Sequence, residues 1–336
     1  MTIKDIARIS GVSVSTVSRV LNQHPDVSED ARNKVLEIVE RYNYIPNNSA
    51  RALGQSKSDN IGLIVRGISN PFYTSIIHEI EKDIEDAGYT LVMQQIASTA
   101  DELLAGAMME QDKRLLGLIF LGGRLDYTKE QVAAIDIPFV SCSSNNAYGT
   151  LDSDSYSSVS IDDTQTAYEA VKGLYQGGHR RIAVLLSRPD DGSVSQIRYE
   201  GYVKALTEMG MAPEEDLIIS VGSYNIADAY QGMLQWLDRG ISFDAVFAIA
   251  DNLAMGAMRA MRERGIEIPK QCSVVAIDGI EVSEYMAPAL STYCQPMEQL
   301  GSTSVQLLID LIEQEGAHQQ VVLPTVFRQG GTIMER

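Results

Sequence analysis

The sequence contains few of the residues that cross-link small secreted proteins or bind metals. Three cysteines occur among 336 residues, with no CxxC pair and no even set that a disulfide framework would need. We therefore expect reduced, mostly structural thiols in a cytoplasmic protein. The four histidines are scattered, without the spacing of metal ligands. These absences predict that the chain binds no metal.

Long apolar runs and catalytic motifs are missing as well. No apolar stretch reaches the length that spans a bilayer, and no signal peptide precedes the first helical pattern. The pair Gly122-Gly123 is no phosphate loop, because the motif GxxxxGK[ST] is absent. No Ser/His/Asp constellation is visible either. We expect no cofactor, no enzymatic activity and no membrane association.

Positive charge is scarce, since 27 Lys and Arg stand against 45 Asp and Glu, a formal net charge of −18. The imbalance is confined to one part of the chain. Residues 1–60 carry eight basic and seven acidic side chains, whereas residues 61–336 carry 19 and 38. The acidic part is expected to stay soluble and away from nucleic acid, which leaves the first sixty residues as the part suited to approach a polyanion.

Residues 2–22 have the pattern of two short helices joined by a tight turn. Thr2 and Asp5 have the spacing of a capping box at the start of the first helix. Gly11 suits the turn, because glycine takes a left-handed backbone without a Cβ clash. The first helix has an apolar face at helical spacing, made by Ile3, Ile6, Ala7 and Ile9.

The second helix combines an apolar inner face with a small, polar outer face. Ser13 suits its N-cap, and Val17, Val20 and Leu21 point inward. Small outward residues let a helix lie deep in the major groove of DNA, where they reach base edges and phosphates. A generic capped helical hairpin would share this pattern. The outward set is Ser15, Thr16, Ser18, Arg19 and Asn22.

Further segments favour a DNA-binding unit over a generic hairpin. The motif VSEDARNKVLEIVE at residues 27–40 predicts a third helix, with a serine N-cap, acids in its first turn and apolar positions at Val35, Leu36, Ile38 and Val39. The motifs YNYIPNNSARAL and IGLIVRGISNPFY follow. With these motifs, the whole chain closely resembles the lactose- and galactose-repressor family of bacterial transcription regulators.

The resemblance implies a homodimer whose two headpieces read the half-sites of a near-palindromic double-stranded DNA operator. A net charge of +1 over residues 1–60 predicts a modest affinity for nonspecific DNA. Val14 and Ser15 match the family's main specificity positions, and Leu53 matches its leucine that wedges into the minor groove. The hinge at 47–53 is too short for a stable isolated helix and would fold on cognate DNA. The expected DNA contacts are Thr2, Ser13, Val14, Ser15, Thr16, Ser18, Arg19, Asn22, Ser28, Asn47, Ala50 and Leu53.

From residue 60 onward, short apolar runs alternate with helical segments in two successive series. The first contains NIGLIV, YTLVMQQI, LLGLIFLG, PFVSCS and SSVSID, and the second contains RIAVLLS, DLIISVG, AVFAIA, CSVVAID and LSTYCQ. Two such series predict an α/β core with two doubly wound, mostly parallel sheets. A helix at 296–315 and a last strand, VVLPTVF, follow. The resemblance implies a two-lobed, periplasmic-binding-protein-like core, to whose first and second lobes these two elements return.

The family fold implies the domain boundaries. Residues 1–45 would form an all-α helix-turn-helix headpiece, 46–59 the hinge helix and linker, and 60–336 the effector-binding and dimerisation core. Within the core, the first lobe would comprise about 60–161 and 291–323, and the second about 162–290 and 324–336. No long apolar heptad tail ends the sequence, so we expect a dimer rather than a tetramer.

The isoleucine-rich helix at 71–88 begins beside the predicted ligand site. It is expected to form the dimer seam and to transmit a ligand-driven movement to the partner lobe and to both hinges. The alternative is an ordinary amphipathic helix, with one side in the core and the other in solvent. The residues expected at the seam are Ile76, Ile77, Ile80 and Glu81.

Polar and aromatic residues follow the carboxyl ends of the predicted strands, where open α/β sheets bind ligands. Aromatic faces stack on sugar C–H surfaces, and a carboxylate or guanidinium holds two neighbouring hydroxyls. The resemblance adds Gln165 and marks Arg198 and Asp278 as the family's most regular effector contacts. One guanidinium and two acids favour a neutral sugar over an anion. The expected effector-binding residues are Phe72, Tyr73, Gln165, Arg198, Tyr224, Asp251 and Asp278.

Five of these side chains have a structural alternative. Asp251 and Asp278 could cap helices, and Phe72 and Tyr73 could belong to the core. Arg198 could pair with an acid across the cleft. The sequence leaves these alternatives open.

The predicted function is an effector-controlled transcriptional regulator, a repressor of carbohydrate-use genes. Relatives commonly have Asn at the position of Ala250, so a ligand pose copied from them is not expected. A sugar-binding module for transport would need an export signal, and an enzyme on this scaffold would need a catalytic constellation. A corepressor-dependent regulator that responds to a non-sugar metabolite is the alternative within the same class.

Overall fold

The computed structural model describes residues 2–21, 24, 26–42, 58–67, 70–190 and 192–334. The chain divides into two compact units, Met1–Ser58 and Asp59–Arg336. In the described part, no helix is long and apolar enough to cross a membrane. The expected DNA contacts Asn22, Asn47, Ala50 and Leu53 lie outside the described residues, as does the hinge.

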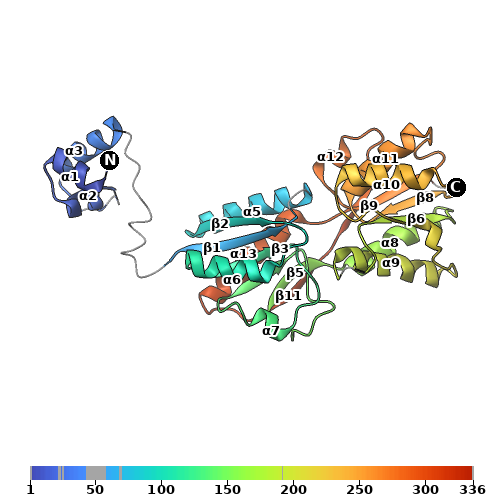
Figure 1. Cartoon of the computed structure of the whole chain (residues 1–336), viewed down its shortest axis with the longest axis horizontal. Helices are drawn as coiled ribbons and strands as arrows, with labels where there is room; N and C mark the ends of the chain where they lie inside the picture. Colours follow the sequence, from blue (N-terminus) through green and yellow to red (C-terminus); the bar gives the residue numbers. More distant parts are fainter. Residues whose placement is uncertain are drawn as a thin grey trace. The chain divides into compact units, whose positions relative to one another are not determined.

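The first unit is made of three helices, drawn in dark blue in Figure 1. The predicted capping box is present: the Thr2 hydroxyl accepts the Asp5 amide at 3.3 Å, and the Asp5 carboxylate accepts the Thr2 amide at 3.0 Å. Gly11 takes the turn with φ 69°, and the Ser13 hydroxyl accepts the Thr16 amide at 3.1 Å. The helices are α1 (Ile3–Ser10), α2 (Val14–Leu21) and α3 (Glu29–Arg41).

A small apolar core joins these three helices. Ile9 and Leu36 were predicted to belong to it, but they are 43% and 46% exposed. Each of the three short helices buries only one stripe of its surface against the other two. Leu36 is rotated by about 100° around the α3 axis from the buried Val35, so it lies outside that stripe. The buried residues are Ile6, Ala7, Val17, Val20 and Val35.

The second unit contains the two predicted sheets, which lie in two lobes (Figure 1). The first sheet has the strand order β11-β5-β4-β3-β1-β2, and all its neighbouring strands are parallel. Its strands are β1 (Asn60–Arg66), β2 (Thr90–Ile96), β3 (Gly117–Leu121), β4 (Phe139–Cys142), β5 (Ser157–Ile161) and β11 (Gln320–Leu323). The helices of this lobe are α5 (Phe72–Asp86), α6 (Glu102–Lys113), α7 (Lys129–Val132) and α13 (Met297–Ile312).

The second sheet has the order β12-β10-β9-β8-β6-β7, with β12 antiparallel to β10 and the other neighbours parallel. Its strands are β6 (Ile182–Leu186), β7 (Ile218–Ser220), β8 (Ala245–Ala248), β9 (Ser273–Asp278), β10 (Ser291–Cys294) and β12 (Val326–Arg328). Its helices are α8 (Asp163–Gln176), α9 (Val194–Glu208), α10 (Ile226–Leu237), α11 (Asp251–Glu263) and α12 (Glu281–Glu284), with a 3₁₀ turn, η1 (Glu215–Leu217).

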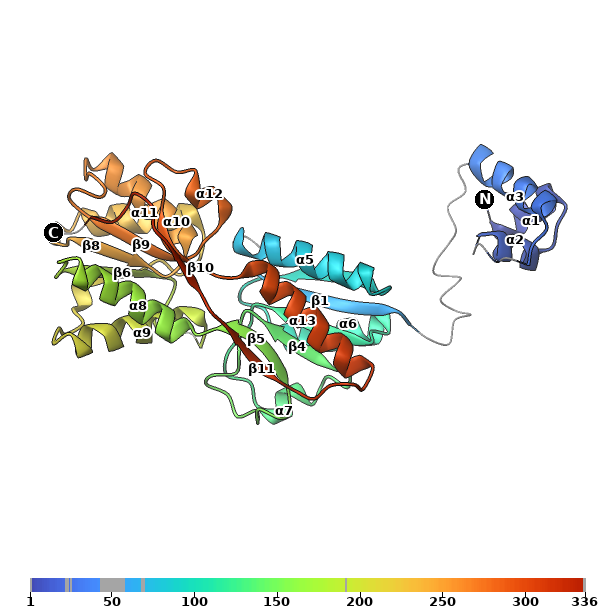
Figure 2. The same cartoon turned by 180° about the vertical axis from the view of Figure 1, so that it is seen from behind.

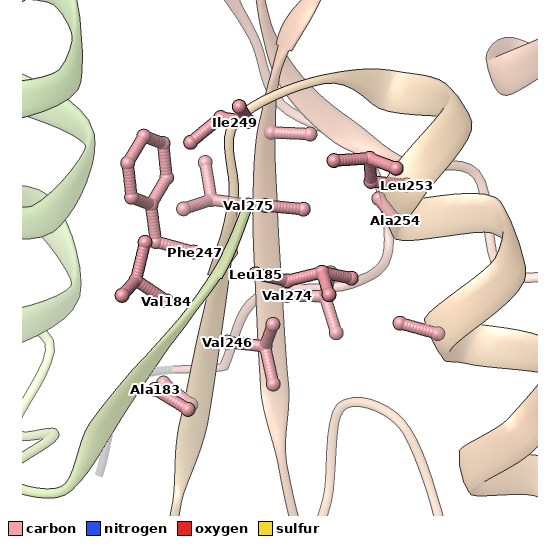
Figure 3. Close-up of a cluster of buried hydrophobic side chains, with 14 of the residues drawn as sticks. Ala183, Val184, Leu185, Val246, Phe247, Ile249, Leu253, Ala254, Val274 and Val275 are labelled. Carbon is pink, nitrogen blue, oxygen red and sulfur yellow. The ribbon is translucent and has the colours of Figure 1, made fainter. Parts of the chain in front are cut away.

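Helices cover both faces of the second sheet, so its central strands are continuous apolar runs rather than alternating ones. Figure 3 shows Phe247 and Val184 on one side of β6 and β8, and Leu253 and Ala254 of α11 on the other. Every residue of β6 and β8 is buried. This packing fixes the strand ends from which the polar side chains described below project.

The chain crosses between the lobes three times (Figure 2). One lobe boundary and one strand differ from the prediction, whereas the boundary between residues 323 and 324 agrees with it. Ser291–Cys294 pairs with β9 and β12, so the return to the first lobe begins after Cys294 rather than at residue 291. The predicted last strand is two strands, β11 in the first sheet and β12 in the second. Pro324 lies between them, and a proline has no amide to continue a ladder.

The isoleucines of α5 pack inward. Ile76 and Ile80 are fully buried in the core of their own lobe, where α5 lies against α13. They therefore cannot form the dimer seam that the sequence predicted for them. Ile77 is half-buried and Glu81 is exposed, so these two residues of the predicted seam remain accessible.

Close helix packing places Arg198. Gly201 lies one turn after Arg198 on α9, and a Cβ built on it would stand 2.7 Å from the Ala167 Cβ of α8 and clash with the Thr164 carbonyl. Glycine at this position therefore lets α9 approach α8 closely enough for contacts between their side chains.

We predict that Gly201→Ala destabilises the second unit by about 1–3 kcal/mol, because an added methyl overpacks the α8–α9 contact. Gly173→Ala in α8 is the matched control: nothing lies within 4 Å of its added Cβ, so it should stabilise by roughly 0.5–1 kcal/mol. Thermal unfolding of both variants checks this. Equal melting temperatures for the two would contradict it.

Candidate functional site: a DNA-reading helix and an interlobe cavity

The outer face of α2 carries the expected small and polar residues. Ser13, Ser15 and Arg19 are exposed, and Val14 is 41% exposed despite being apolar. Thr16 and Ser18 are half-buried. An accessible valine beside hydroxyls suits contact with a thymine methyl and with phosphates.

The other described DNA candidates lie at helix starts. Thr2 and Ser28 are exposed and directly precede α1 and α3. The Ser13 hydroxyl lies 2.7 Å from that of Ser15 and 2.8 Å from that of Thr16. Hydroxyls and free amides at helix N-termini are groups that bind phosphate oxygens.

Within the second unit, a cavity of about 480 Å³ opens between the two lobes. This volume is in the range of small-molecule sites. The predicted residues Phe72, Tyr73, Arg198, Tyr224 and Asp278 all line it. The cavity wall also contains hydroxyl side chains from both lobes, namely Ser98, Thr99, Ser143, Ser187, Ser193 and Ser223.

Arg198 is buried at the second-lobe side of the cavity and pairs with two acids. Its Nε donates to Asp163 at 2.7 Å, and its Nη1 donates to Asp278 at 3.3 Å and to the Ile249 carbonyl. Burial raises the pKa of the Asp163 and Asp278 carboxyls, and the Arg198 charge opposes the shift. Nε and Nη1 are thus committed to the protein.

Asp278 ends β9 with a strained backbone, since its φ of 135° is unusual for a side chain with a Cβ. Its Oδ1 accepts Arg198 and the Gln295 amide, the latter at 2.8 Å. Its Oδ2 is buried and has no partner within hydrogen-bond distance in the described part of the chain, although the Asn70 side chain is near enough to oppose the rise in the Asp278 pKa. A buried carboxylate oxygen with free acceptor capacity at a cavity wall is suited to a ligand hydroxyl.

The aromatic residues come from both lobes. The Asn70 side chain accepts the Phe72 amide at 3.1 Å and holds the start of α5. The Phe72 and Tyr73 rings lie 5.5 Å apart between centroids. Burial, with a smaller contribution from the Asp278 charge, raises the pKa of Tyr73 to about 12, so its hydroxyl stays a donor. Tyr224 lines the opposite lobe.

The sequence reasoning missed three arginines of the cavity wall, Arg66, Arg124 and Arg188. They follow or end β1, β3 and β6, so the strand-end rule applied to every strand would have found them. The predicted balance of one guanidinium against two acids is therefore wrong for the wall itself. Two of the added charges are neutralised by acids behind the wall, because Arg66 lies 3.5 Å from Glu102 and Arg124 lies 2.7 Å from Asp126.

Two predicted residues do not line the cavity. Gln165 is a half-buried residue in the first turn of α8, and its side-chain amide donates to Glu169 at 3.1 Å. This bond runs along the helix rather than into the cavity. Asp251 is fully buried beneath the segment that follows Asp278.

Asp251 supports the cavity from behind. Its Oδ2 accepts the amides of Gly279 and Ile280 at 3.1 and 3.0 Å and the Ser283 hydroxyl at 2.8 Å, while its Oδ1 accepts the Thr292 hydroxyl. These bonds fix the backbone directly after Asp278 and tie it to β10. Asp251 thus acts within the protein, by bonding the segment after Asp278 and β10 rather than by capping its own helix, α11, which has no side-chain cap.

Burial, and then the nearby Asp278 charge, raises the pKa of Asp251 above its ordinary value. A carboxyl whose pKa is higher in the folded state than in the unfolded state adds to the free energy of unfolding at pH below about 4, where it is protonated. This contribution is lost as the pH rises through the folded-state pKa. Asn at 251 imitates the neutral acid. We predict that the parent loses stability relative to Asp251→Asn as pH rises from about 4 to 7. Calorimetric melting at several pH values measures the difference, and a constant difference would refute the claim.

Comparison with known proteins gives two family matches. The family described as bacterial regulatory proteins, lacI family, matches residues 2–47, and the periplasmic binding protein-like domain matches residues 171–333. The HTH-type transcriptional regulator MalR of Clostridium butyricum is 40% identical over 329 residues, which cover 97% of each chain.

Solved structures agree over the whole length. The Lac repressor dimer bound to operator and the anti-inducer ONPF is 27% identical with a TM-score of 0.78. The transcriptional regulator CelR in complex with cellobiose is 26% identical with a TM-score of 0.72. Each similarity covers 99% of both chains. With its three-helix headpiece and two-lobed core, the chain is a DNA-binding transcriptional regulator that belongs to the lacI family.

Proposed function

We propose that this protein is a dimeric repressor of carbohydrate-use genes whose operator affinity is controlled by a neutral sugar bound between the lobes. The observation that carries the proposal is the interlobe cavity, whose wall contains the buried, ion-paired Asp278 with an Oδ2 that accepts no hydrogen bond among the described residues. The solved relatives hold cellobiose or a ligand named ONPF, which supports a sugar-like effector.

The chemistry of the cavity wall favours hydroxyl-rich ligands. Six serine or threonine side chains and the amides Asn70, Asn225 and Gln295 both donate and accept hydrogen bonds. Three of the four wall arginines already face protein carboxylates, so little uncompensated positive charge is left for an anion. Phe72, Tyr73 and Tyr224 supply aromatic surface for sugar C–H groups.

We place the dimer contact of the first lobe on α6 and the outward side of α5. Leu104 and Met108 lie one turn apart on the same face of α6, and each is 61% exposed. Large apolar side chains that are exposed together are typical of an interface. Ile77 and Glu81 on α5 are the remaining accessible members of the predicted seam.

Ligand control requires that the sugar and the operator prefer different lobe arrangements, because equal affinity for both arrangements would shift nothing. Three chain crossings join the lobes, and Gln295 lies at one of them while donating to Asp278. A ligand that engages Asp278 therefore acts next to a crossing. The hinge helix at 47–53, with Leu53 as minor-groove wedge, is the proposed recipient of this change.

For the reading helix, we predict that Arg19→Ala weakens operator binding by about 1–3 kcal/mol and relaxes preference at one base position, because a base-directed guanidinium is lost. Arg8→Ala removes the same charge from an exposed position on α1, where Arg8 pairs with Asp5. Selection from a randomised duplex library by both variants measures the effect. Identical selection by Arg19→Ala and the parent would exclude the assigned role.

For the cavity, we predict that Asp278→Ala abolishes sugar-induced release of operator while DNA binding persists. The change removes one of the two acidic partners of Arg198, while Asp163 still pairs with the guanidinium. It also removes an acceptor of ligand hydroxyls, so sugar affinity should fall by a few kcal/mol. The exposed Asp152, which pairs with Lys129, provides the control variant Asp152→Ala.

The assay is operator release measured with maltose, cellobiose, ribose and their phosphates. Operator release by phosphorylated sugars and not by neutral ones would overturn the neutral-sugar assignment. Tighter operator binding in the presence of a sugar would reassign the protein as corepressor-dependent.

A further inference from the structure

An acid stands directly beside the proposed DNA-reading arginine. Asp26 lies in the loop between α2 and α3, and its Oδ2 is 3.2 Å from the Arg19 Nη1. Its other oxygen, Oδ1, is 3.1 Å from the His24 Nδ1. The side chains of Arg19 and Asp26 are 58% and 52% exposed, so the pair lies at the surface that α2 presents.

The backbone of His24, which contacts Asp26, is hydrogen-bonded to both α2 and α3. The His24 amide donates to the Arg19 carbonyl at 2.9 Å, which anchors the loop to the end of α2. The Arg32 guanidinium of α3 donates to the His24 carbonyl at 2.5 Å. His24, whose ring contacts the Asp26 carboxylate, is thus bonded through its backbone to both helices.

This ion pair differs from the other headpiece pairs in the described residues. Asp5 with Arg8 and Asp30 with Lys34 lie within one helix, three and four residues apart. The pair of Asp26 with Arg19 instead links the reading helix to the loop that follows it. It engages Nη1 of the guanidinium, so other N–H groups of the planar fork are left for a base edge.

Electrostatics alone would argue against an acid at this surface, because a carboxylate near phosphates is repulsive. The headpiece has little positive charge to offset such repulsion. An acid here is useful where it orders a cation. An arginine side chain has many rotamers. A guanidinium that is already held in one orientation loses less conformational entropy when it forms a hydrogen bond to a base.

We propose that Asp26 is a positioning residue for DNA readout. It holds the Arg19 guanidinium in one orientation, so that Arg19 discriminates between bases instead of serving as a mobile phosphate contact. Asp26 lowers general affinity for DNA through its charge and raises sequence selectivity through Arg19. The inference rests on the proposed role of Arg19 in the major groove.

The test uses the full-length protein and the variants Asp26→Asn and Asp30→Asn. Each removes one negative charge from the headpiece, and Asp30 is a matched control because it pairs with Lys34 alone among the recorded ion pairs. Two quantities are measured: base preference in selection from a randomised duplex library, and affinity for nonspecific duplex as a function of salt.

Both variants should bind nonspecific DNA more tightly than the parent, with steeper salt dependence, because repulsion is removed. Of the two variants, only Asp26→Asn should show weaker base discrimination, by about tenfold at one position. This is part of the discrimination that one good base contact contributes. An unchanged base preference in Asp26→Asn, or an equal loss in Asp30→Asn, overturns the proposal.

A double-mutant cycle with Arg19→Ala separates this inference from the proposed function. If Asp26 acts through Arg19, then Asp26→Asn has no effect on base preference once Arg19 is absent. An effect that persists overturns the positioning role. If Arg19→Ala leaves base preference unchanged, the proposed role of Arg19 fails, and the positioning role of Asp26 fails with it. If Arg19→Ala loses base preference but Asp26→Asn does not, only the positioning role is rejected. Asp26→Glu, which keeps the charge, should restore part of the preference.

Discussion

The second lobe is organised around a buried charge cluster that cannot be dismantled piecemeal. Arg198, Asp163 and Asp278 all lie out of solvent, and desolvating three charges costs more than their attraction returns unless hydrogen bonds complete the set. The Ile249 carbonyl and Gln295 supply such bonds. Because loss of Arg198 would leave two buried carboxylates without a counter-charge, α8, α9 and the ends of β8 and β9 must hold fixed relative positions.

Two features outside the cavity serve this cluster. Gly201 lets α9 approach α8, which brings Arg198 to Asp163. Asp251 fixes the backbone that follows the strained Asp278 and connects it to β10. The same strand leads to Gln295, which binds Asp278 and begins the crossing to the first lobe. Packing, cavity and interlobe connection are therefore one continuous arrangement rather than three separate ones.

Local patterns predicted most elements, because capping boxes, apolar runs and helix periods act within a few residues. They predicted neither that Asp251 faces inward nor that Gln165 bonds Glu169 instead of lining the cavity, since both stand at helix starts and only long-range packing decides their orientation. The split of VVLPTVF between two sheets depends on partner strands far away in the sequence. The missed arginines needed no new principle, because Arg66 and Arg124 follow the strand-end rule that found Arg198 and Asp278.

The three crossings mean that neither lobe is a continuous stretch of chain. The first lobe receives α13 and its edge strand β11 from residues 297–323, after the second lobe has all its strands except β12. During synthesis, the headpiece can fold from the first residues, whereas the first-lobe sheet keeps an uncovered apolar face until translation is almost complete. A chain that stops early would thus keep its DNA-reading helices but lack a finished core, which makes such products subject to chaperone and protease control rather than to a sugar signal.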